Sequence, residues 1–191
     1  MRLTAKLLIS AYTQGIFPMG VDGELQWFCP DPRAIIPLDL FHVPKTLGQL
    51  YRRGFFEIRV NTCFREVMLA CADRPEGSWI TDEIVRAYVR LFRLGVAHSV
   101  ECWREERLVG GLYGVSLGGA FFGESMFHRH RDASKVALVA LVERLRARGF
   151  TLLDTQFKTD HLARFGVVEI PREMYLRKLD AALQMPCRFA D

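Results

Sequence analysis

The chain has 191 residues, of which 50% are hydrophobic and 25% charged, and it carries a formal net charge of +4. This length and apolar content are those of an ordinary globular protein of one to one and a half domains. The sequence contains no run of eighteen or more apolar residues, so it predicts no transmembrane helix. The start, around Arg2 and Lys6, lacks the apolar core and the cleavage site of a signal peptide. We therefore expect a cytoplasmic protein without a membrane partner.

Cysteine and histidine spacing gives no sign of a metal site. The five cysteines are odd in number and lack the close pairs of zinc sites, and the histidines have no acid at ligand spacing. Basic residues cluster at 52–53, 129–131 and 144–148, which allows an anionic partner but is more often the solvated face of a helix. We expect no metal and no cofactor.

The first part of the chain, residues 1–60, is interrupted by five prolines, which disrupt regular structure. We predict a small N-terminal lobe there, made of short helices joined by turns. Residues 61–191 give cleaner signals and form the predicted second domain. A helix is expected over residues 62–72, and another begins after Thr81 and ends at Gly95.

The next segments are rich in Val, Phe, Tyr and Trp, and they are predicted strands: residues 97–104, 107–116 and 119–127. Their short connections favour an antiparallel meander. A helix follows over residues 134–148, then a strand over 151–156, and a last helix begins at Pro171. This order resembles the core of the acetyltransferase superfamily. We therefore predict an α+β protein in which residues 61–191 form an acetyltransferase-like (GNAT-like) domain.

Two acidic residues lie in segments that otherwise have the composition of buried strands. Glu124 follows Phe121 and Phe122, and Asp154 follows two leucines. An ionised carboxylate is costly in such a place unless it is paired or functional. Asp154 and Gln156 are two residues apart on a predicted strand, so we expect them on one face, with Glu124 near the same crevice. The alternative is that both acids pair with Arg or Lys side chains in the core.

Short motifs run along almost the whole chain, each weak alone but highly specific in their joint order. They are Ala11-Tyr12, Gly15-Ile16-Phe17-Pro18, Trp27-Phe28, Pro30-Asp31-Pro32-Arg33, Gly77-Ser78-Trp79-Ile80-Thr81, Val109-Gly110-Gly111-Leu112-Tyr113-Gly114-Val115, Phe122-Gly123-Glu124-Ser125-Met126-Phe127, Ala133-Ser134-Lys135, Asp154-Thr155-Gln156, His161-Leu162 and Glu169-Ile170-Pro171-Arg172. On these residues the chain resembles the leucyl/phenylalanyl-tRNA:protein transferases. These bacterial enzymes move leucine or phenylalanine from charged tRNA to the N-terminal Arg or Lys of proteins.

The resemblance implies an aminoacyltransferase that transfers Leu or Phe, and Met less efficiently. The transferred residue marks the acceptor protein for degradation by the N-end rule. It also implies that residues 61–191 are the catalytic domain. The chain departs from the family pattern in a few places. Eleven residues precede Tyr12, fewer than usual, so the predicted lobe is short for the family, and Cys29 and His128 replace common serines.

By the same resemblance, Asp154 and Gln156 are the expected catalytic residues. Asp154 accepts a hydrogen bond from Gln156, whose amide oxygen orients the attacking amine, because an amide is no real base at neutral pH. Glu124 is expected to bind the cationic first residue of the acceptor, and Tyr12 to lie near the terminal adenosine or the peptide. The side chains expected to stack on the adenine or to wall the pocket are Trp79 and Phe121.

An apolar pocket admits Leu and Phe with imperfect selectivity, because one methylene discriminates by only about 1–3 kcal/mol. The candidate lining residues, for each of which plain core packing is the alternative, are Met126, Phe127, Leu138 and Leu153. A helix start in this region offers amides for a phosphate of the tRNA CCA end, unless it is an ordinary helix cap. The candidate phosphate-binding residues are Arg129, Arg131, Ser134 and Lys135.

Two other functions remain open. An acyl-CoA-dependent N-acyltransferase uses the same core but needs a glycine-rich pyrophosphate loop before the helix, and residues 129–133 contain no glycine. A non-catalytic RNA- or peptide-binding module does not need Asp154 and Gln156 on one strand face. The expected partners are leucyl- or phenylalanyl-tRNA and proteins or peptides with N-terminal Arg or Lys. We expect a monomer, because no heptad pattern calls for a partner.

Overall fold

A computed structural model describes residues 3–190. They form a mixed α/β fold with a seven-stranded sheet in the order β4-β5-β6-β7-β8-β3-β9 and a separate hairpin, β1-β2. The strands are β1 (Phe17–Val21), β2 (Glu24–Phe28), β3 (Arg33–Ile36), β4 (Glu57–Val60), β5 (Ala97–Arg104), β6 (Arg107–Leu117), β7 (Ala120–His128), β8 (Leu152–Gln156) and β9 (Val168–Ile170). The helices are α1 (Ala5–Tyr12), α2 (Lys45–Arg52), α3 (Phe64–Ala72), α4 (Asp82–Arg93), α5 (Ala133–Ala147), α6 (Asp160–Ala163) and α7 (Arg172–Leu183), with a 3-10 turn at Leu38–Leu40.

The predicted meander is confirmed, because β5, β6 and β7 pair antiparallel in chain order. Helix α5 leads from β7 to β8, and these two strands form the only parallel pair among the described residues. The helices after residue 61 also lie close to their predicted bounds. Thr81 caps α4 by accepting a hydrogen bond from the Ile84 amide, and Gly95 follows the helix with a positive φ of 71°.

Residues 1–60 do not consist of short helices joined by turns, and that prediction is wrong for much of this segment. Four strands lie there: the hairpin β1-β2, the edge strand β4, and β3, which lies between β8 and β9. Prolines end helices but are tolerated at the ends and outer edges of strands, and Pro32 and Pro37 flank β3 directly. The division of the chain into two domains near residue 60 stays a prediction.

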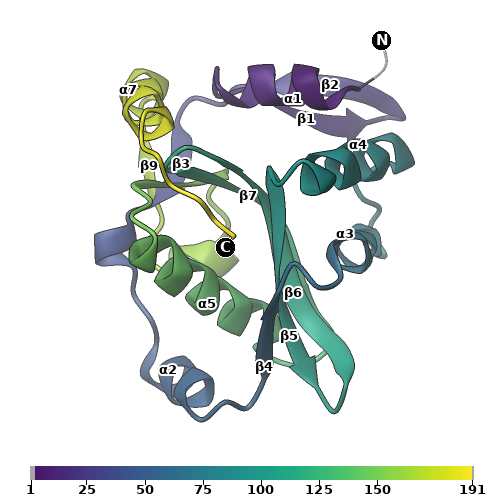
Figure 1. The fold of residues 1–191 in the computed structure, drawn as a ribbon, viewed down its shortest axis with the longest axis vertical. Helices are drawn as coiled ribbons and strands as arrows, with labels where there is room; N and C mark the ends of the chain where they lie inside the picture. The colour runs from purple at the N-terminus through teal and green to yellow at the C-terminus, as the bar shows by residue number, and fades with distance from the viewer. Residues whose placement is uncertain (1–2, 191) are drawn as a thin grey trace.

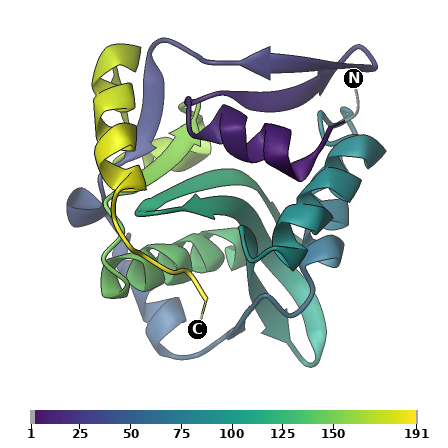
Figure 2. The same cartoon turned by 45° about the horizontal axis from the view of Figure 1, so that its top comes forward.

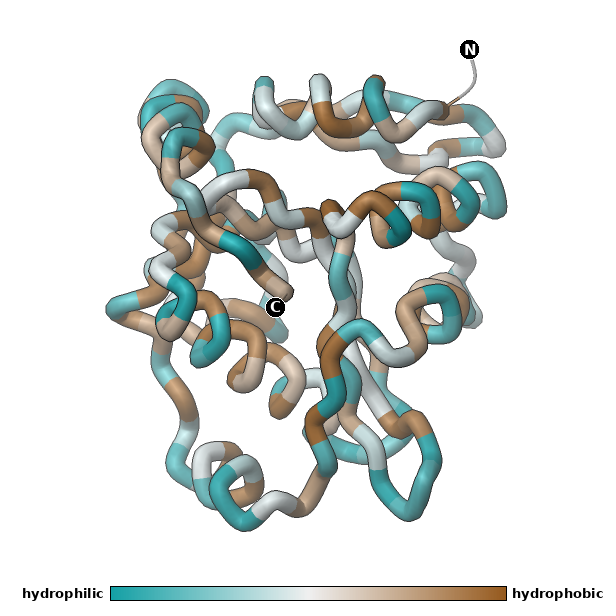
Figure 3. The backbone as a smooth tube through the Cα atoms, viewed as in Figure 1, coloured by the Kyte–Doolittle hydropathy of each residue, from teal (hydrophilic) through white to brown (hydrophobic). Residues whose placement is uncertain are grey.

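Helices cover both faces of the sheet and define two cores. Figure 1 shows α3 and α4 on one side of β5, β6 and β7 and α5 on the other. The alternation of strand side chains divides neighbours between them, so that Phe122 packs in the α3–α4 core and Phe121 in the α5 core. Figure 3 shows strongly hydrophobic residues along α5, and all residues from 136 to 142 are buried. Figure 2 shows α1 beside the β1-β2 hairpin at one end of the molecule.

Pairing between β7 and β8 stops early. It covers three residue pairs and ends at Phe122 with Asp154, although β7 continues to His128. Each strand has an irregular register there. Glu124 is an extra residue of β7 opposite β6, and Thr155 is an extra residue of β8 opposite β3. Such bulges re-aim side chains and end strand pairing. The two strands therefore separate at the two acids that the sequence singled out.

No helix within residues 3–190 has the length and apolar character needed to span a membrane.

Candidate active site

A cavity of about 600 Å³ lies where β7 and β8 separate. Apolar side chains of the α5 core form one part of its wall: Leu112, Leu138, Leu141 and Leu153. Residues that pack with the other core form a second part: Phe17, Met19, Trp79 and Tyr113. Glu124 and Gln156 border the same space. The cavity is therefore a mostly apolar space that also contains a carboxylate and an amide.

The structure brings half of the predicted site residues to this cavity: Trp79, Glu124, Met126, Ser134, Leu138, Leu153 and Gln156. Phe121 and Phe127 do not border it. Phe121 is fully buried in the α5 core, with its ring centroid 5.0 Å from that of Phe189. Phe127 is also buried, and the guanidinium of Arg129 lies 5.6 Å from the centre of its ring. For Phe127 the alternative of plain core packing therefore describes the structure.

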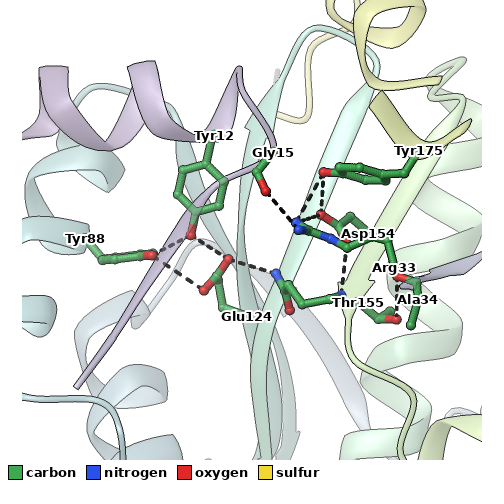
Figure 4. Close-up of polar contacts among 10 residues, drawn as sticks. Tyr12, Gly15, Arg33, Ala34, Tyr88, Glu124, Asp154, Thr155 and Tyr175 are labelled. Atoms are coloured by element: carbon green, nitrogen blue, oxygen red, sulfur yellow. Dashed lines mark hydrogen bonds and ion pairs between the residues drawn. The ribbon is translucent and has the colours of Figure 1, made fainter. Parts of the chain in front are cut away.

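Asp154 is held in the protein interior by four hydrogen-bond donors (Figure 4). Arg33 donates from Nε to Oδ1 at 2.9 Å and from Nη2 to Oδ2 at 2.6 Å, and the Tyr175 hydroxyl donates to Oδ2 at 2.8 Å. The backbone N–H of Gln156 donates to Oδ1 at 2.9 Å. Asp154 and Arg33 are fully buried, and Asp154 does not border the cavity. For Asp154, the alternative of a core ion pair describes the structure.

Arg33 was not predicted from the sequence as a site residue, although it is the main partner of Asp154. Its Nη1 also donates to the carbonyl of Gly15 at 2.8 Å, and its guanidinium lies over the rings of Phe17 and Tyr175 at 4.9 and 4.4 Å. A usable signal was present, because Arg33 directly precedes three buried apolar residues of a strand. The rule that singled out Asp154, a charge in an apolar strand, applies equally to Arg33.

Asp154 and Gln156 do not share a strand face, so that prediction is wrong. The extra residue Thr155 breaks the alternation of β8, and the backbone of Gln156 is left-handed, with φ of 59°. Gln156 therefore borders the cavity while Asp154 lies behind it. The hydrogen bond between them uses the backbone of Gln156, and its side-chain Nε2 donates instead to Glu124 Oε1 at 3.2 Å.

Glu124 lies among neutral hydrogen-bond donors. The Tyr12 hydroxyl donates to its Oε1 at 2.6 Å, and the Tyr88 hydroxyl to its Oε2 at 3.5 Å, while the two hydroxyls also bond to each other. Tyr12 is fully buried and reaches Glu124 from the end of α1, so it does not border the cavity. Among the described residues, Glu124 has no ion pair.

Burial raises the pKa of Glu124 to about 8, and the negative charge of Asp154 adds to this shift. The hydrogen bond from Tyr12 and the charge of Arg33 lower the pKa and offset part of the effect. The raised pKa favours the protonated carboxyl at neutral pH. A cation that enters the cavity favours the ionised form, because an opposite charge nearby stabilises a carboxylate.

The candidate phosphate-binding residues lie around the start of α5 but are not all at the cavity. Ser134 borders it, whereas Lys135 forms an ion pair with Asp132 at 2.6 Å. The side chain of Arg131 is 92% exposed, and Arg129 borders a separate hollow beside α3. Asp132 precedes the helix without a side-chain cap to the backbone. Within residues 3–190, no group of His, Cys, Asp and Glu side chains is placed to hold a metal ion.

Replacing Arg33 by glutamine should destabilise the protein by about 3–5 kcal/mol, because Asp154 is then left charged and buried without its ionic partner. Urea unfolding of R33Q and the wild type measures the difference. Arg177→Gln is the control: Arg177 pairs with Glu173 on an exposed face of α7, where ion pairs contribute little. Equal midpoints for R33Q and the wild type would contradict a structural role of the buried pair.

The raised pKa of Glu124 predicts a pH-dependent stability. Between pH 4.5, its ordinary value, and about 8, the folded protein holds a proton that the unfolded chain has lost. The stability due to this proton is complete below that window and is lost as the pH rises through it, by at most about 1.4 kcal/mol per pH unit. Wild-type unfolding free energy should therefore fall relative to Glu124→Gln across this range. Parallel pH profiles in urea unfolding would contradict it, and Glu169→Gln, at an exposed position of β9, is the control.

Comparison with known proteins covers the whole chain. Residues 35–180 match the family described as Leucyl/phenylalanyl-tRNA protein transferase, and residues 1–31 match the N-terminal domain of that family. Proteins named leucyl/phenylalanyl-tRNA--protein transferase from Gloeobacter violaceus and Herpetosiphon aurantiacus are 58% and 59% identical over 98% of this chain and 97% and 98% of their own. A protein of the same name from Rubrobacter xylanophilus is 54% identical over the full length of both chains.

Among solved structures, L-PGS from Bacillus licheniformis is similar at a TM-score of 0.43 and 17% identity, over 83% of this chain and 55% of that chain. That likeness is too low to compare the two sites. The sequence relatives, in contrast, match from end to end at more than half of all positions. The chain belongs to the leucyl/phenylalanyl-tRNA protein transferase family.

Proposed function

We propose that the protein transfers leucine or phenylalanine, and methionine less well, from aminoacyl-tRNA to the N-terminal Arg or Lys of proteins. The new peptide bond marks these proteins for degradation by the N-end rule. One observation carries this proposal: a single cavity combines an apolar wall with the carboxylate of Glu124 and the amide of Gln156. The family membership of the chain and the names of its relatives support the same reaction.

The apolar wall is the proposed site for the transferred amino acid. Leu138 and Leu153 face the cavity from α5 and β8, and Met126 joins them from β7. A Leu or Phe side chain fills such a space without leaving a polar group unpaired. Discrimination by shape is limited to about 1–3 kcal/mol for each missing methylene, so related apolar amino acids such as Met are accepted less well and not excluded.

Glu124 is the proposed site for the charged side chain of the acceptor. It accepts hydrogen bonds only from neutral groups, among the residues that the structure describes, and its carboxyl is accessible from the cavity. A guanidinium or ammonium group ionises it and forms a buried charge-assisted contact. An acceptor with a neutral first residue leaves Glu124 protonated and gains no such contact, which explains a preference for Arg and Lys.

Gln156 is the proposed contact for the attacking amine. Glu124 holds its Nε2, so its amide oxygen is turned to accept from the amine. The amine nitrogen bonds to the ester carbonyl carbon, the bond from that carbon to the ribose oxygen of tRNA breaks, and the amine proton ends on the released oxygen. No cofactor is needed, and alignment of the two substrates supplies most of the acceleration.

Asp154 is proposed as a positioning residue, because it lies behind the cavity wall and acts on Gln156 through the backbone. Its hydrogen bond holds the left-handed conformation that turns Gln156 into the cavity. Tyr12 has a comparable role for Glu124, since it reaches that carboxyl from the buried side. Both residues are thus proposed to support the two side chains that contact the substrates.

The terminal nucleotides of tRNA are proposed to enter beside Trp79 and the start of α5. An indole at a cavity wall offers a stacking surface for adenine. The amides near Ser134 and the basic side chains of Arg129, Arg131 and Lys135 attract the phosphates, although Asp132 already neutralises Lys135. We further propose an acetyltransferase-like core, with the split between β7 and β8 as its substrate site, in a monomeric cytoplasmic enzyme.

A transfer assay tests the proposed function. Incubation with labelled leucyl-tRNA should move the label to peptides that begin with Arg or Lys, and not to the same peptides with an acetylated α-amine. The acetylated peptides are the control, because they keep the charged side chain and lose the nucleophile. Acetyl transfer from acetyl-CoA instead would favour an acyl-CoA-dependent enzyme. Binding of tRNA without any transfer would favour a non-catalytic module.

Gln156→Ala should lower kcat by about ten- to a hundred-fold, because the amine loses the group that aligns it with the ester. Binding of leucyl-tRNA should change less than two-fold, since the apolar wall and Trp79 are intact. Single-turnover rates and filter binding measure the two effects. Gln184→Ala, at an exposed position that ends α7, is the matched control. A rate for Q156A equal to that of the wild type would remove Gln156 from the reaction.

A further inference from the structure

A third tyrosine lies near Glu124 and has an unused hydroxyl. Tyr113 on β6 is fully buried and borders the cavity, yet its hydroxyl has no hydrogen-bond partner among the described residues. Burial and the charge of Glu124 raise its pKa far above the ordinary range, so the hydroxyl is protonated. A buried polar group without a partner lowers stability. This hydroxyl is therefore available to a group that enters the cavity.

The neighbours of Tyr113 fix its ring next to Tyr88, which donates to Glu124, and both Tyr113 and Glu124 border the cavity. Its ring meets those of Phe64 and Tyr88 edge-on, with centroids 5.9 and 6.0 Å away. Tyr113 pairs across the sheet with Ser125 of β7, the residue next to the bulge at Glu124. Tyr88 and Tyr12 already use their hydroxyls on Glu124 and on each other. Tyr113 is thus the member of this tyrosine group that is left for a ligand.

The part of the cavity around Tyr113 and Glu124 suits a cation with several N–H groups. A guanidinium carries five N–H donors and an ammonium three, whereas a carboxylate has about four acceptor sites. Three groups, Tyr12, Tyr88 and Gln156, already donate to Glu124. A neutral hydroxyl oxygen next to Glu124 accepts one of the remaining donors. Arg74 also borders the cavity, but it is exposed and donates to Ser125 Oγ and the Met126 carbonyl, both at 3.2 Å. Its charge reaches the Tyr113 hydroxyl, where it lowers the pKa and opposes the effects of burial and of Glu124, which are larger.

We propose that the Tyr113 hydroxyl and the Glu124 carboxylate together bind the guanidinium or ammonium group of the acceptor's first residue. This inference rests on the proposed function and adds a specificity-determining residue to it. The hydroxyl accepts a hydrogen bond from the bound cation, so its partner arrives with the substrate. Tyr113 does not contact the reacting ester or amine in this arrangement.

Tyr113→Phe tests the proposal with three measurements. Calorimetry should show about ten-fold weaker binding of peptides that begin with Arg or Lys, because one hydrogen bond to a charged group is lost. Binding of leucyl-tRNA should stay within two-fold, and the KM for the peptide should rise by a larger factor than kcat falls. The Tm should be equal to or higher than that of the wild type, because the removed hydroxyl has no partner in the fold. Tyr51→Phe is the matched control, since Tyr51 lies on α2 and bonds to Glu143.

The outcomes separate the proposal from the function on which it rests. If the wild type transfers leucine normally and Y113F binds Arg peptides equally well, the role of Tyr113 is overturned and the proposed function stands. A Tm several degrees below the wild type would show that the hydroxyl has a partner within the fold, which also overturns it. If the wild type neither binds nor modifies these peptides, both proposals fall together.

Discussion

The buried ion pair between Arg33 and Asp154 is the interaction on which the site depends. It joins β3 to β8, and through Tyr175 and the Gly15 carbonyl it also ties in α7 and the turn after α1. A pair of charges with no exposure is stable only when its remaining hydrogen bonds are satisfied. Here the last one comes from the backbone of Gln156. The ion pair thereby fixes the residue that faces the cavity, although neither charge lies in the wall.

Two bulges convert a regular sheet into a site. Without the extra residue at Glu124 or at Thr155, period-two alternation would continue along β7 and β8, and the strands would have no local reason to separate. Their separation exposes side chains of both cores to one space. A carboxylate and an apolar wall are thus neighbours in the same cavity, although a strict alternation would direct them to opposite faces.

Most strands and helices after about residue 62 were predictable, because hydrophobic periodicity and capping residues agree there, as at Thr81 and Gly95. The short elements α6 and β9 were not predicted. The family was predictable from motifs along almost the whole chain. Strands β3 and β4 were missed because each has only four residues, and because the prolines around β3 suggested turns. Glu124 and Asp154 were found as charges in apolar strands. Which face Asp154 occupies was not predictable, because a bulge at Thr155 leaves no mark in the pattern of apolar and polar residues.

The network around Asp154 also has a consequence for biosynthesis. Its members come from both ends of the chain, and the Tyr175 hydroxyl is supplied by α7, the last helix among the described residues. A nascent polypeptide that has not yet released α7 from the ribosome lacks this donor, so the hydrogen bonds around Asp154 are incomplete. An enzyme that takes amino acids from charged tRNA can therefore complete this network only after α7 has been translated and folded onto β8.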